Sequence, residues 1–156
     1  MVYEDPQWHT KPAPEDANIE AFLDRWKEWA QAESVPLRSR FDPIDFPRVL
    51  PWMVLAEVLS VIPFDARLRY LGSEVVHYLD SAGLTGKRLS DLGRVFQDRW
   101  SAVGNLVLST RRPCFFDGAP FMVDRSFMRL ELAALPLSKD GSEVDFIMLL
   151  MVPRNR

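Results

Sequence analysis

Residues 54–92 restrict the possible folds more than any other stretch of this chain. Two apolar runs flank the turn sequence Pro63-Phe64-Asp65, and the second run ends at Gly72. Apolar runs of this length on either side of a turn predict a β-hairpin. Ser73 follows at once and favours the start of a short helix, which the glycines at positions 83 and 86 would stop. The stretch therefore predicts a hairpin followed directly by a short helical segment.

The rest of the chain supplies two longer helices and three more strands. Residues 18–32 and 95–110 carry apolar side chains at helical spacing, and Asp16 or Asn18 can cap the first of these helices. Asp140-Gly141 is the signature of a tight hairpin turn between the last two strands. The order predicts an α+β fold with a five-stranded antiparallel sheet, helices on one face, and an N-terminal amphipathic helix before it. The three further strands are expected at residues 114–116 or beyond, 126–137 and 144–152.

Length and composition predict one domain. The chain has 156 residues, of which 47% are apolar, and this is enough for a well-filled core. Residues 1–15 are polar and rich in proline, which favours a flexible N-terminal arm with Trp8 available as an anchor. The expected organisation is this arm, the amphipathic helix within residues 16–35, and a single domain over residues 36–153.

Charge and cysteine content exclude several classes of function. The formal charge of −3 and the pI near 5.4 give no electrostatic reason to expect nucleic acid as a partner. Cys114 is the single cysteine, so no disulfide can form within the chain. The first residues lack a signal segment, and the longest apolar run, residues 146–152, is too short to span a bilayer. These features predict a cytoplasmic protein with no membrane partner.

Three separated sequence pieces carry a resemblance to a known superfamily. They are Arg69-Tyr70-Leu71-Gly72-Ser73, Leu84-Thr85-Gly86-Lys87-Arg88-Leu89 and Leu135-Pro136-Leu137-Ser138-Lys139-Asp140-Gly141. In this order they resemble a PAS domain. Their amino-acid sequence is similar to that of a family of short bacterial stand-alone PAS-like proteins of unassigned activity. The resemblance spans roughly residues 26–152. It implies a sensory or protein-interaction module in signal transduction, and it carries over no catalytic residue.

The markers of the PAS cofactor classes are missing or displaced. Flavin photoreceptors of the superfamily have a reactive cysteine before the long helix, whereas Cys114 follows that helix. Haem needs an axial ligand, and His77 is the only internal histidine, placed in the short helix instead of the long one. We therefore expect neither flavin nor haem, although a small apolar ligand is compatible with the sequence.

No catalytic or metal-binding set emerges from the sequence. One cysteine and two distant histidines cannot supply the usual zinc ligands. The residues around Ser73 do not form a nucleophile elbow. The carboxylate pairs Asp42 with Asp45 and Asp117 with Asp124 are typical of turns. A non-enzymatic protein is the prediction, and an enzyme with an unfamiliar site is a weaker alternative.

Two hypotheses about function remain open. In the first, the inner face of the sheet and the neighbouring helices enclose a pocket for a small, partly apolar molecule. In the second, the same side chains fill the core, and the protein acts only through protein interaction or dimerisation. The candidate pocket residues are His77, Tyr78, Trp100, Phe127, Leu130, Leu132, Ile147 and Leu149.

The N-terminal helix is the candidate interface. Its apolar stripe is broad and needs to be buried against this domain or against a second copy. The sequence predicts a homodimer whose two-fold contact uses this stripe, with a separate signalling protein as a further partner. In the alternative, the helix packs on the sheet of its own chain and the protein is monomeric. The stripe consists of Ile19, Phe22, Leu23, Trp26 and Trp29.

Overall fold

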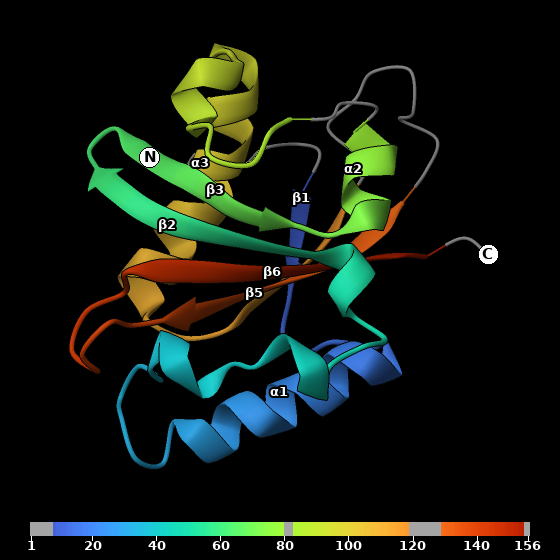
Figure 1. The fold of residues 1–156 in the computed structure, drawn as a ribbon, viewed down its shortest axis with the longest axis vertical. Helices are drawn as coiled ribbons and strands as arrows, with labels where there is room; N and C mark the ends of the chain where they lie inside the picture. The colour runs from blue at the N-terminus through green and yellow to red at the C-terminus, as the bar shows by residue number, and fades with distance from the viewer. Residues whose placement is uncertain (1–7, 80–82, 119–128, 155–156) are drawn as a thin grey trace.

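The structure of the protein is a computed structural model, described here for residues 8–79, 83–118 and 129–154. Within these residues the fold is α+β: a six-stranded antiparallel sheet with helices on both faces (Figure 1). None of the helices that the structure describes is long and apolar enough to cross a membrane.

Two hairpins form the middle of the sheet and one of its edges. Strands β2 (Met53–Val61) and β3 (Phe64–Leu71) form the predicted first hairpin, and β5 (Leu130–Leu137) pairs with β6 (Phe146–Pro153) around the Asp140-Gly141 turn. Strand β4 (Cys114–Gly118) pairs with β5. The strand order is β1-β4-β5-β6-β2-β3, so the β2–β3 hairpin joins the sheet through β6.

The main helices begin and end close to the predicted positions. Helix α1 (Ala17–Trp29) is capped by Asp16, whose carboxylate accepts the backbone N–H groups of Asn18 and Ile19. Helix α2 (Ser73–Leu79) follows the hairpin, and α3 (Arg94–Thr110) ends at Arg111, which has a left-handed φ of 57°. The described residues also contain four short 3₁₀ turns: η1 (Arg38–Arg40), η2 (Pro43–Asp45), η3 (Leu50–Trp52) and η4 (Leu89–Leu92).

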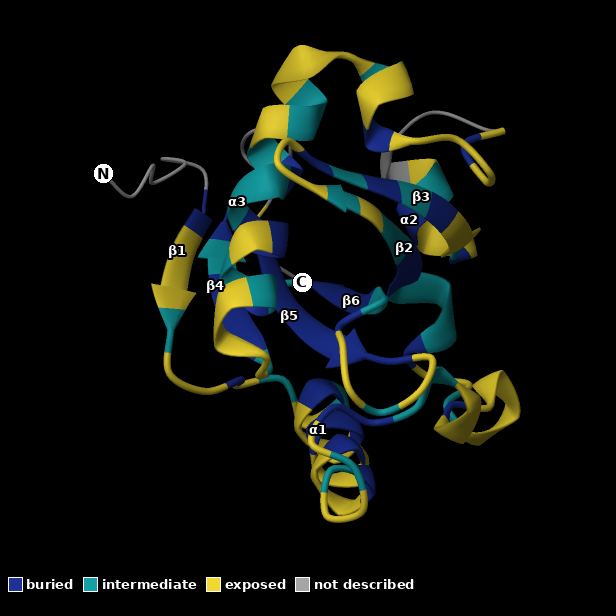
Figure 2. Cartoon of the chain, turned by 90° about the vertical axis from the view of Figure 1, so that its left-hand side faces the viewer, coloured by how far each residue is buried: buried dark blue, intermediate teal, exposed yellow. Residues whose placement is uncertain are grey.

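Alternating side chains give the sheet two buried faces. On β5, Leu130, Leu132 and Ala134 join the core beneath α3, while Ala133, Leu135 and Leu137 join a second core beneath α1. Strands β5 and β6 are therefore buried on both sides, as Figure 2 shows by their dark colour. This explains why both strands are almost continuously apolar in sequence.

The sixth strand corrects the expected count of five. Strand β1 (Trp8–Lys11) lies in the segment predicted to be a flexible arm, and it pairs with β4 from Trp8↔Gly118 to Lys11↔Phe115. Trp8 is only 6% exposed. The prediction missed this strand because four residues beside three prolines carry too little pattern to indicate one.

The position of α1 corrects two further predictions. The helix lies on the face of the sheet opposite α3, so the helices do not share one face (Figure 2). Its apolar stripe packs on the sheet of its own chain, where the Trp26 indole Nε1–H donates to the Pro136 carbonyl at 2.9 Å. All five stripe residues are buried, so they are core residues instead of a free two-fold interface. The stripe consists of Ile19, Phe22, Leu23, Trp26 and Trp29.

Candidate functional site

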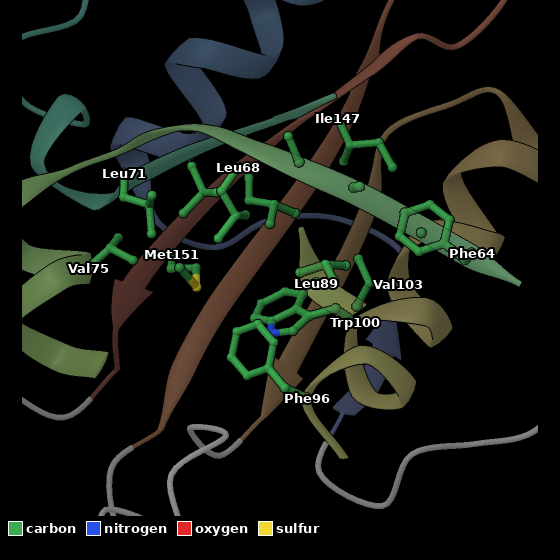
Figure 3. A pocket seen from close by; sticks show the side chains of 15 residues that line it. Phe64, Leu68, Leu71, Val75, Leu89, Phe96, Trp100, Val103, Ile147 and Met151 are labelled. Carbon is green, nitrogen blue, oxygen red and sulfur yellow. The ribbon is translucent and has the colours of Figure 1, made fainter. Parts of the chain in front are cut away.

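A wholly apolar cavity lies between the sheet and α3. Its volume is about 40 Å³, and strands β2, β3 and β6 form one wall while α2, η4 and α3 form the other (Figure 3). The lining residues are Val54, Ala56, Phe64, Ala66, Leu68, Leu71, Val75, Leu89, Phe96, Trp100, Val103, Gly104, Ile147, Leu149 and Met151.

Small side chains on neighbouring strands create this space. Ala56 on β2 and Ala66 on β3 both face α3, and they leave room that larger strand residues would fill. Phe64 closes one end of the cavity, and Leu71 with Val75 borders the other (Figure 3). At the Phe64 end the helix comes very close to the ring, since a Cβ at Gly104 would lie 2.3 Å from it. The cavity therefore exists because small side chains at Ala56, Ala66 and Gly104 lie among larger ones in its lining.

The size and chemistry of the cavity limit what it can hold. A cavity of 40 Å³ has room for a water-sized or xenon-sized particle, whereas an engineered cavity of about 150 Å³ binds benzene and typical ligand pockets measure about 300–1,000 Å³. The lining offers no polar side chain except the indole N–H of Trp100. Water would gain few hydrogen bonds there, so the site is suited to an apolar occupant.

The structure places three of the eight predicted pocket residues at this cavity. Trp100, Ile147 and Leu149 line the cavity. Leu130 and Leu132 belong to the same buried core but are not among its lining residues. Phe127 lies outside the described residues, and so does the side chain of Tyr78.

His77 was predicted on the wrong side of its helix. Among the α2 side chains that the structure describes, Val75 lines the cavity, and His77, two positions later, is exposed. Two residues along an α-helix turn a side chain by roughly 200°, to the opposite face. His77 is therefore not placed to ligate a group bound in the cavity.

Sequence reasoning missed the contribution of β3. Phe64, Ala66 and Leu68 line the cavity in the period-two pattern of a strand face. The sequence favoured a turn at Pro63-Phe64-Asp65, so Phe64 was not expected on a strand. Reading the alternation from Phe64 would have found this wall.

Cys114 is buried and separate from the described cavity lining. Its thiol lies 3.5 Å from the Thr110 hydroxyl. Burial raises the pKa of the Cys114 thiol, and the Thr110 contact offsets this only in part. The group thus stays protonated at neutral pH, which favours an inert core residue over a nucleophile.

A second cluster is charged and ties the N-terminal strand to the sheet. Glu131 is 2% exposed and accepts the backbone N–H groups of Glu15 and Asp16 at 2.6 and 3.0 Å. The Lys11 ammonium lies 3.0 Å from Glu131 and 2.9 Å from Asp117. Burial alone would lower the pKa of Lys11, but the hydrogen bonds to Asp117 and Glu131 outweigh it and the pKa is raised.

Arg154 completes this cluster from the end of β6. Its guanidinium lies 2.9 Å from Glu15 and 3.6 Å from Glu131. Three carboxylates thus face two cations, and they hold β1, the start of α1 and the end of β6 together. In the described parts of the chain, no group of three or more His, Cys, Asp or Glu side chains could hold a metal ion. The arrangement supports a structural role for the cluster.

A shallow groove lies on the other side of the molecule, between α1 and residues 45–49. Its volume is about 420 Å³, and its wall contains Phe22, Phe46, Arg25 and Arg48. Arg25 already stacks on Phe46 with its guanidinium carbon 5.6 Å from the ring centre. The groove is bordered by exposed charged residues, so the apolar cavity between the sheet and α3 is the stronger candidate site.

Comparison with known proteins does not assign this chain to a family. The chain matches no protein-family model, and no curated protein is significantly similar to it.

Proposed function

We propose that this chain is a non-enzymatic, PAS-like sensory module that binds a small apolar molecule in the cavity between the sheet and α3. The cavity carries this proposal, because its lining is wholly apolar and it lies where the sheet and the helices meet. The order of strands and helices and the sequence pieces quoted above support the PAS-like reading.

The lining indicates the chemistry of the ligand. Since its surface is apolar, binding would be driven by removing apolar surface from water and by contact with the walls. Hydrogen bonds would contribute little to orienting the ligand in the cavity. The shape and size of the ligand would therefore decide whether it binds. No flavin, haem or metal belongs to this proposal.

An alternative function is protein interaction without a ligand. The small volume of the cavity favours this alternative, because a core can contain such a void by imperfect packing alone. An exposed apolar surface is also present: Leu59, Val61 and Ile62 at the β2–β3 turn are 42%, 55% and 93% exposed. A partner protein or a second copy of the chain could contact the module there.

Xenon binding followed by methyl NMR tests whether the cavity can hold an apolar occupant, which the proposed function requires. Xenon should shift the methyl signals of Ile147, Leu149 and Met151, which line the cavity on β6. Met148 and Leu150 lie on the same strand but in the core beneath α1, so they are the internal control and should not shift. Equal, weak shifts on both faces would contradict the proposed site and favour the alternative.

Protein purified from cells provides a second test. Native mass and absorption spectra should show no visible band, and any bound species should be a small apolar molecule. A coloured cofactor that co-purifies in stoichiometric amount would contradict the proposal.

A further inference from the structure

The Trp100 side chain takes part both in the cavity wall and in an aromatic contact with strand β1. Its indole forms part of the cavity wall, and it also packs against Trp8 of strand β1, with ring centres 5.4 Å apart. Trp8 in turn packs edge-on against Phe116 of β4, at 6.3 Å between ring centres. The edge strand is therefore in direct contact with the back of the cavity wall.

The Trp8 side chain is held by apolar packing, without a side-chain hydrogen bond in the part of the chain that the structure describes. The strand has four residues and lies at the outer edge of the sheet, where it pairs with β4 (Figure 2). The indole Nε1 of Trp8 is buried without a hydrogen-bond partner among the described residues. A buried donor without a partner opposes docking, and release of the strand would return this N–H to water.

The other end of β1 is firmly anchored. Lys11 is bound by Asp117 at 2.9 Å and by Glu131 at 3.0 Å, and these carboxylates belong to β4 and β5. Movement of β1 is thus easiest at Trp8, with Lys11 as the fixed point.

We propose that strand β1 responds to occupancy of the cavity, and that release of Trp8 lets the cavity expand. This inference rests on the proposed function. A molecule larger than the 40 Å³ space needs a wall to move, and Trp100 packs against Trp8, so an outward movement of Trp100 would displace Trp8. Such a molecule binds the released arrangement better, so it shifts the population toward that arrangement. By reciprocity, loosening β1 increases the affinity for the molecule by the same factor.

Benzene is a suitable probe, because it exceeds the volume of the closed cavity. Hydrogen exchange of the Trp8 indole N–H should accelerate in saturating benzene by at least about fivefold, the lower end of typical coupling between two sites. Trp26 is the internal control, because its indole N–H is bonded to Pro136 in the opposite core. Its exchange should not change.

The variant Lys11→Met tests the reverse direction without leaving a hole beside Trp100. It should bind benzene more tightly than the parent protein, while Lys27→Met, at an exposed lysine of α1, should not. Benzene binding with unchanged or slower Trp8 exchange would overturn the coupling but leave the proposed function intact. Binding of xenon but not of benzene, in the parent and in Lys11→Met, would also overturn the coupling. Binding of neither would overturn the proposed function and the coupling with it.

Discussion

Gly104 of α3 lies directly against the ring of Phe64 of β3. A Cβ atom at position 104 would come within 2.3 Å of the ring, which is closer than any real contact of this kind. The glycine therefore lets the helix approach the hairpin and sets the width of the cavity at this end. Both residues line the cavity, so their contact links the packing of the fold to its candidate site.

Gly104→Ala should destabilise the protein despite the better helix propensity of alanine. The added methyl group forces the buried Phe64 ring to move, at a cost of about 1–3 kcal/mol, while the propensity gain is about 1 kcal/mol. In a Phe64→Leu background the same change should instead be neutral or stabilising. Denaturant unfolding of the four proteins in this cycle gives the coupling energy. Additive effects would contradict the contact.

Enlarging a residue inside the cavity should be tolerated better than enlarging its neighbour. Val103 lines the cavity, and Val107, one turn later on α3, is buried in the same core but outside the lining. Val103→Ile can place its extra methylene in the void and should gain up to about 0.8 kcal/mol. Val107→Ile should lose about 1–3 kcal/mol through overpacking. Equal losses in thermal or urea unfolding would show that no usable space exists at Val103.

The alternation of apolar residues predicted most of the fold, including the hairpins, α3 and the order of elements. It could not predict which face of the sheet α1 covers, because a helical stripe has the same period whatever it packs against. The stripe of Phe22 and Trp29 therefore suggested a two-fold interface, although it lies on its own sheet. The contacts of Glu131 with Lys11 and Arg154 could not be predicted from the sequence either, because strand pairing brings these distant residues together.

Glu131→Gln should destabilise the protein on the order of 3 kcal/mol, because it removes a buried carboxylate from two cations and two backbone N–H donors. In the Glu131→Gln background, Lys11→Met should lower the free energy of unfolding by less than it does in the parent protein, because the Lys11–Glu131 ion pair is already broken. Asp45→Asn, at an exposed carboxylate, is the control and should change stability by less than about 0.5 kcal/mol. Unfolding in urea at neutral pH measures all of these effects. Identical costs of Lys11→Met in both backgrounds would argue against the ion pair.

Glu57 should contribute to stability only above the acid range. The hydrogen bond from Arg69 lowers the pKa of Glu57 below its ordinary value of 4.5, and Lys139 adds to this effect. Because the folded-state pKa is the lower one, the stabilisation is present above pH 4.5 and is lost as the pH falls through the folded-state pKa. Glu57→Gln should be less stable than the parent at pH 7, by up to about 1 kcal/mol, and equal to it in strong acid. Curves of stability against pH that stay parallel from neutral to acid conditions would rule out this contribution.

Crystals of the protein exposed to xenon under pressure test the ligand site most directly. We expect one strong xenon peak, bordered by Leu68 of β3, Trp100 of α3 and Leu149 of β6, and its loss in crystals of Val103→Ile but not of Val107→Ile. An empty cavity, or xenon bound only in the groove beside Phe46, would contradict a ligand site between the sheet and α3.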